Sequence, residues 1–156
     1  MESFREGFRF ACLRGCTRCC AASGWVYLTE ADLKRAAGWL GLSAREFEQR
    51  YVYRTRHLLR LRKPPHAQCP FLTGDGCAIH PVKPTQCRAF PFWPELISSR
   101  QAWRSLARRC PGVGQGERVP FAAVQRIADE MLSAYPSMYS HFGKVRRLPA
   151  RRARSS

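Results

Sequence analysis

The sequence predicts a mixed α+β fold, namely a small, mainly helical domain with one short β-hairpin. Two helix-capping patterns, at residues 29–32 and 43–46, and an apolar stripe over residues 121–134 indicate the helices. The turn sequence TGDG between two short apolar pairs indicates the hairpin. The chain has 156 residues, 45% of them hydrophobic, so we expect a single domain over residues 1–143 and a basic tail over 144–156.

Two successive helices are expected after the first cysteines. Thr29 can cap the first helix, with Asp32 at the third helical position, and a glycine then ends it. Ser43 and Glu46 repeat this pattern for a second helix, which we expect to end near Tyr53.

Two further elements follow from apolar patterning. Residues 57–62 indicate a short extended run, which a pair of prolines stops. An amphipathic helix is expected over residues 121–134, and it should bury one apolar face formed by Val124, Ile127, Ala128 and Met131.

The hairpin should bring two cysteines together. The glycines and the aspartate of the TGDG turn can take positive φ values, which would place Cys69 and Cys77 at the base of the hairpin. After it, Pro81 and Pro84 predict a stiff, extended connection to Cys87, one that a helix could not follow. All three thiols can then face one centre.

Clustered cysteines are the main chemical feature of the chain. The N-terminus lacks the apolar run of a secretory signal, so we expect a cytoplasmic chain with reduced thiols. Reduced, clustered thiols favour a metal site over disulfides, and cysteines that only fill a core would not cluster. Thiolates select zinc or iron–sulfur clusters, usually four to a centre. We therefore expect zinc or iron, with [4Fe-4S] as one form, to staple the fold through Cys12, Cys16, Cys19, Cys20, Cys69, Cys77, Cys87 and Cys110.

The first cluster is open to several interpretations. Cys12, Cys16 and Cys19 have the C-x3-C-x2-C spacing of radical SAM enzymes, but the chain is too short for their barrel and Arg18 stands where an aromatic residue is usual. The adjacent side chains of Cys19 and Cys20 diverge, which suits two centres, or one centre with a spare thiolate. The division of the cysteines stays open, and a crossover between the two halves would couple metal binding to folding.

Two residues near the later cysteines are secondary candidates. His80 lies three residues after Cys77 and is a candidate additional ligand, whereas the other histidines are interpreted as ordinary side chains. Arg88 follows Cys87 and is expected to donate hydrogen bonds to thiolate sulfurs or backbone carbonyls. The sequence offers no carboxylate pair, nucleophile–base pair or phosphate loop, so we assign no catalytic residue.

The chain is strongly basic. It has 27 Lys and Arg against 11 Asp and Glu, which gives a net charge of +16. The basic residues concentrate between Arg50 and Lys63 and in the tail over 144–156, where they could contact nucleic-acid phosphates or simply form a solvated face. No stretch approaches the roughly 20 apolar residues of a spanning helix, so we expect no membrane insertion.

Four segments together resemble a known family. The segments that carry the resemblance are CLRGCTRCC, LTEADLKRAAGWLGLSAREF, CPFLTGDGCAIHPVKPTQCRAFPF and a later cysteine beside Pro-Gly. Over about residues 12–116 the chain resembles the YkgJ-type cysteine-cluster family of zinc- or iron-chelating domains. The resemblance implies that all eight cysteines are metal ligands. One similar branch, the flagellin lysine N-methylases, is linked to methyl transfer and an iron–sulfur cluster. His80 and Lys83 depart from the tyrosine and arginine that are usual in the family.

Three functional classes follow, in this order. The first is a metal-binding module that holds zinc or iron through the eight cysteines. The second is an iron–sulfur enzyme of the protein methyl-transfer or redox type. The third is a metal-stapled nucleic-acid-binding module that uses the two basic stretches.

Overall fold

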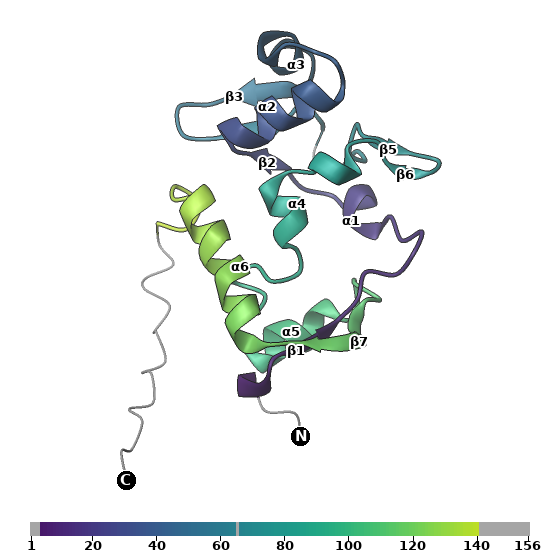
Figure 1. Ribbon diagram of the computed structural model, residues 1–156, viewed down its shortest axis with the longest axis vertical. Coiled ribbons are helices and arrows are strands. Elements are labelled where there is room, and N and C mark those ends of the chain that lie inside the picture. Colours follow the sequence, from purple (N-terminus) through teal and green to yellow (C-terminus); the bar gives the residue numbers. More distant parts are fainter. Residues whose placement is uncertain (1–3, 65, 141–156) are drawn as a thin grey trace.

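The computed structural model describes residues 4–64 and 66–140 and has the predicted mixed α+β architecture (Figure 1). The expected basic tail over 144–156 and His141 lie outside the described residues. The helices are η1 (Phe4–Glu6), α1 (Arg18–Ala21), α2 (Glu30–Trp39), α3 (Ala44–Tyr51), η2 (His80–Val82), α4 (Thr85–Ala89), α5 (Arg100–Leu106) and α6 (Phe121–Ala134). The strands are β1 (Phe8–Phe10), β2 (Tyr27–Leu28), β3 (Val52–Arg54), β4 (Leu59–Leu61), β5 (Leu72–Thr73), β6 (Gly76–Cys77) and β7 (Val113–Val119).

The strands form small antiparallel sheets. β2, β4 and β3 form a three-stranded sheet with β4 in the centre, and β1 pairs with β7. β5 and β6 form the predicted hairpin, in which Leu72 lies opposite Cys77. Within its turn only Gly76 has a positive φ, of 112°, whereas the sequence allowed positive values at Gly74 and Asp75 as well.

Both predicted capping boxes are present. The Thr29 hydroxyl accepts the Asp32 amide N–H at 3.0 Å, and the Asp32 carboxylate accepts the Thr29 N–H at 2.9 Å. At α3, the Ser43 hydroxyl accepts the Glu46 N–H at 3.1 Å and the Glu46 carboxylate accepts the Ser43 N–H at 2.8 Å. Each pair satisfies amides that the first helical turn leaves without intrahelical partners, which fixes where the two helices begin.

The ends of the middle elements differ slightly from expectation. α3 ends at Tyr51 and not near Tyr53, because the chain enters β3 at Val52, which is buried and pairs with Leu61. The extended run expected over residues 57–62 is confirmed in its middle, where β4 covers Leu59–Leu61. The amphipathic helix expected over residues 121–134 is confirmed as α6.

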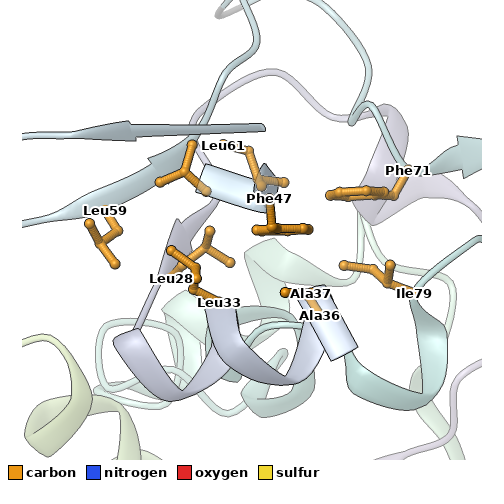
Figure 2. Close-up of a cluster of buried hydrophobic side chains, with 10 residues drawn as sticks. Leu28, Leu33, Ala36, Ala37, Phe47, Leu59, Leu61, Phe71 and Ile79 are labelled. Atoms are coloured by element: carbon orange, nitrogen blue, oxygen red, sulfur yellow. The ribbon is translucent and has the colours of Figure 1, made fainter. Parts of the chain in front are cut away.

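One apolar cluster joins α2 and α3 to the three-stranded sheet. Phe47 of α3 is fully buried at its centre, above Ala36 and Ala37 of α2 (Figure 2). The ring of Phe71 stacks on Phe47 with centroids 6.0 Å apart, and Ile79 packs beside them. The segments before and after the hairpin are therefore held by the same core as α2 and α3.

The remaining apolar clusters line α6. Met131 and Tyr135 pack against Ala89 of α4, and Val124 packs against Phe8 of β1 and Phe92. In Figure 1, α6 runs from the α5, β1 and β7 end of the molecule toward the end that carries α2 and α3, with α4 beside it. The segment that contains the first cysteines runs from β1 up to α1, which lies near α4 and the hairpin.

The extended connection predicted between Cys77 and Cys87 is wrong. The chain forms the 3-10 helix η2, which contains Pro81, and then α4, which begins directly after Pro84. Proline lacks an amide N–H, but the first positions of a helix need no intrahelical donor, so both prolines are tolerated there. Cys87 consequently lies on a short helix.

Candidate metal centre

The first four cysteines lie on a loop and a short helix. After β1, the Ala11 amide donates to the Gly112 carbonyl at 3.1 Å. A side chain on Gly112 would meet the Ala11 carbonyl oxygen, since a Cβ there would lie 2.3 Å from it. This close approach brings the loop that begins at Cys12 alongside the turn that carries Cys110. The loop then turns at Gly15, whose φ is 76°, and enters α1 with Cys19 and Cys20.

The hairpin places its two cysteines as predicted. The Leu72 amide donates to the Cys69 carbonyl at 3.0 Å, and Leu72 pairs with Cys77 across the hairpin. The Cys69 amide donates to the Cys20 carbonyl at 2.8 Å, which ties α1 to the start of the hairpin. Cys20, Cys69 and Cys77 therefore converge although the first two lie 49 positions apart in the sequence.

A buried polar network fixes α4 and with it Cys87. The buried Asp32 carboxylate accepts hydrogen bonds from the Thr85 amide at 3.0 Å and from the Thr85 hydroxyl at 2.9 Å. The Tyr135 hydroxyl accepts the Gln86 amide at 3.1 Å and donates to the Tyr27 carbonyl at 3.0 Å. The Tyr27 amide of β2 also donates to Gln86 Oε1 at 2.8 Å, so α2, β2 and the residue directly after α6 all hold the first turn of α4.

The eight thiols divide into two neighbouring groups of four. Cys19 interacts electrostatically with Cys110, Cys12 and Cys16. Cys20 interacts with Cys77, Cys69 and Cys87. We call these groups the outer set (Cys12, Cys16, Cys19 and Cys110) and the inner set (Cys20, Cys69, Cys77 and Cys87). The adjacent cysteines 19 and 20 belong to different sets, and the two sets adjoin where Cys87 interacts with Cys19.

Protonation differs among these thiols. A hydrogen bond between the side chains of Cys20 and Cys77 lowers the pKa of Cys77 and raises the pKa of Cys20. Burial raises the pKa of Cys87 to about 12. Burial, with repulsion from Cys110 and other thiolates of the outer set, raises the pKa of Cys19 to about 11. Most of the shifted thiols therefore hold their protons at neutral pH.

Two lysines counter the charge of the thiolates, and the sequence interpretation assigned neither of them this role. Lys63 is buried, interacts with Cys69, and donates from Nζ to the Ala67 carbonyl at 2.6 Å. Lys83 interacts with thiols of both sets, namely Cys19, Cys77 and Cys87. Its position between Cys77 and Cys87 in the sequence was the available signal.

The secondary candidates lie at the surface. His80 is exposed at the start of η2, and its ligation of metal stays a prediction. The Arg88 guanidinium donates to the carboxylate of Glu130 on α6. Hydrogen bonding of Arg88 to thiolates likewise stays a prediction.

The basic stretch between residues 50 and 63 is largely engaged within the fold. Four of its basic residues contact carboxylates, aromatic rings or carbonyls: Arg54 with Glu30 and Glu48, Arg60 with the rings of Trp25 and Tyr53 at 3.9 and 4.8 Å, Arg62 with Val52, and Lys63 with Ala22 and Ala67. These contacts give the stretch a structural role. No helix within the described residues is long and apolar enough to cross a membrane.

The donor chemistry of the two sets fits zinc or iron. Each set offers four soft sulfur donors, the number that a closed zinc site or a complete iron–sulfur site requires. Within residues 4–64 and 66–140, no three His, Cys, Asp or Glu side chains form a group already arranged to hold a metal ion. Ligation would therefore draw the thiols of each set closer together.

Comparison with protein families gives a match that covers more than half of the chain. The family model CxxCxxCC, described as "Putative zinc- or iron-chelating domain", matches residues 11–111, a range that includes all eight cysteines. No solved structure matches the chain.

Proposed function

Because the chain belongs to the CxxCxxCC family of zinc- or iron-chelating domains, we propose that its eight cysteines hold two metal centres. The outer set would hold one centre, and the inner set would hold the other. The observation that carries this proposal is the division of the thiols into two groups of four, with Cys19 and Cys20 assigned to different groups.

The arrangement supports a role for metal in folding. Each set draws its thiols from segments that are distant in the sequence: the outer set joins the loop after β1 to the turn before β7, and the inner set joins α1, the hairpin and α4. A bound zinc or iron centre supplies strong metal–thiolate bonds, and these would cross-link the segments. Lys63 and Lys83 would offset part of the negative charge that four thiolates leave on each centre.

The nature of the metal decides between the functional classes. A colourless protein with two zinc ions per chain would support a structural or storage module. Iron with acid-labile sulfide, visible absorbance and sensitivity to oxygen would instead support an iron–sulfur enzyme of the methyl-transfer or redox type. A nucleic-acid-binding module requires affinity for RNA or DNA that falls steeply with salt.

The test is metal analysis of the full, untagged chain purified without oxygen. Plasma mass spectrometry gives the metal and its amount per chain, and a visible spectrum with a sulfide assay identifies a cluster. The proposal expects enough zinc or iron for two centres. A chain that folds cooperatively while binding neither metal would overturn it.

A further inference from the structure

Resting on the proposed two-centre function, we infer that the centres are not equivalent: the inner centre is a permanent structural element, whereas the outer centre exchanges its metal ion with thiolate-bearing molecules. The difference follows from how each set is exposed and how its backbone is held.

Exposure separates the two sets. Cys12 and Cys19 of the outer set are exposed, and Cys16 is half-buried. None of the four inner cysteines is exposed, and Cys69 and Cys77 pack against the apolar cluster that contains Phe71 and Ile79. An incoming ligand can therefore approach outer sulfurs directly, whereas core side chains cover much of the inner set.

Backbone anchoring separates them further. Backbone hydrogen bonds hold the inner cysteines: the Cys69 amide donates to the Cys20 carbonyl at 2.8 Å, and Cys77 is paired with Leu72 in the hairpin. The fourth inner cysteine, Cys87, lies on α4, which Asp32 and Tyr135 hold through buried hydrogen bonds. Opening the inner set would break these bonds and the packing of the hairpin.

The outer set has a weaker frame. Its first two cysteines lie on the loop between β1 and α1, where the Cys16 amide closes a turn onto the Leu13 carbonyl at 3.1 Å. Leu13 is 42% exposed, so this loop has little apolar anchoring beside the cysteines. Cys110 is the buried member and would stay in place while the loop moves. Local opening of such a segment needs less free energy than opening of a core element.

The exchange step needs no redox chemistry. A thiolate of the acceptor would form a bond to the metal ion as the bond from Cys12 or Cys19 breaks, and the same exchange would repeat at the remaining outer cysteines until the acceptor holds the ion. The released cysteine thiolate then takes a proton from water or from the acceptor's next thiol, so the charge on the metal ion is unchanged. A donor of the ion would use the reverse sequence. The partner class is accordingly a small molecule or protein that presents thiolates.

Chelation kinetics on the full chain test this inference. The chain is loaded with zinc, its two ions are confirmed by plasma mass spectrometry, and a chromogenic chelator is added in excess. We expect two phases, each of one ion, with the first at least about tenfold faster. After the first phase, a brief pulse of iodoacetamide and peptide mass spectrometry should find label on Cys12, Cys16 and Cys19 and not on Cys69, Cys77 or Cys87.

The outcomes are distinguishable. Release of both ions in one phase, or early labelling of the inner cysteines, would overturn the inference while leaving two centres intact. Fewer than two ions before the chelator is added would overturn the two-centre function itself. A Cys12→Ser variant should lose the fast phase and keep the slow one, and Leu13→Ala is its control on the same loop, expected to keep both phases.

Discussion

Asp32 and Thr85 are joined by two hydrogen bonds: one carboxylate oxygen of Asp32 accepts the Thr85 amide at 3.0 Å and the other accepts the Thr85 hydroxyl at 2.9 Å. The same carboxylate caps its own helix through Thr29. A single buried acid therefore fixes the start of α2 and the start of α4. α4 begins at Thr85, two residues before Cys87.

Replacing Asp32 by Ala should strongly destabilise the chain. The substitution leaves the buried Thr85 amide and hydroxyl without their acceptor, and we expect the free energy of unfolding to fall by about 3 kcal/mol. Urea denaturation of the metal-loaded protein measures this loss. Glu46→Ala, which removes the matching but exposed capping carboxylate of α3, is the control and should cost much less. Equal losses in the two variants would contradict a linking role for Asp32.

The Tyr135 hydroxyl supports the same helix from the other side. Tyr135→Phe keeps the buried ring but removes the group that accepts the Gln86 amide and donates to the Tyr27 carbonyl. We expect a loss of about 1–2 kcal/mol in unfolding free energy, because two polar groups lose their partner. Tyr53→Phe is the matched control at a surface site, where the side chain is 48% exposed, and its denaturation midpoint should not change.

Metal binding should release protons. The pKa of Cys87 is raised to about 12 and that of Cys19 to about 11, so both thiols are protonated at pH 7 in the metal-free chain. Each must lose its proton to become a ligand, and metal affinity therefore rises with pH and falls as the solution becomes more acidic. For each such thiol we expect about a tenfold change in affinity per pH unit below its pKa. Competition with a chelator of known pH dependence, at pH 7 and pH 8, measures this, and an affinity that does not change would contradict it.

The sequence predicted those helices and strands that depend on a pattern of neighbouring residues, such as a capping box, a turn sequence or an apolar helix face. The capping boxes of α2 and α3, the TGDG hairpin and the apolar face of α6 each appear where the sequence places them. β7, with the sequence VGQGERV, carries no alternating apolar pattern and forms because β1 pairs with it from more than 100 residues away. Such a pairing depends on tertiary contacts, so propensity could not predict it.

The candidate site was predictable in part. The eight clustered cysteines indicated candidate donors, and the adjacency of Cys19 and Cys20 suited either two centres or one centre with a spare thiolate. The assignment of each cysteine to a set requires the fold. The sequence assigned Asp32 only a role in capping its own helix. It lies one helical turn before the buried Ala36, and that spacing was the signal that its carboxylate faces the interior.

Lys63 should act through the fold and not through a nucleic-acid partner. Its Nζ donates to the Ala67 and Ala22 carbonyls at 2.6 and 3.4 Å, so it ties the segment before Cys69 to the end of α1. Lys63→Met keeps much of the side chain and should lower the unfolding free energy by about 2 kcal/mol. Arg56→Met, at an exposed position in the same basic stretch, should change it by less than about 0.5 kcal/mol. Equal effects in urea denaturation would contradict the structural role of Lys63.

Serine substitutions distinguish the two sets. Cys16→Ser removes one sulfur from the outer set and should abolish one centre while the other keeps its metal, with a small loss of stability because residues 11–17 of the loop after β1 include no buried core residue. Cys87→Ser removes a ligand on α4, and it should abolish the inner centre and lower the melting temperature by about 10 °C, since that centre would cross-link the hairpin to α4. Plasma mass spectrometry and thermal melting of both variants, beside the unaltered chain, provide the measurements. Unchanged metal content and unchanged melting in both would contradict the assignment of the cysteines as ligands, whereas loss of all metal from Cys16→Ser alone would show that the two sets form one interdependent centre.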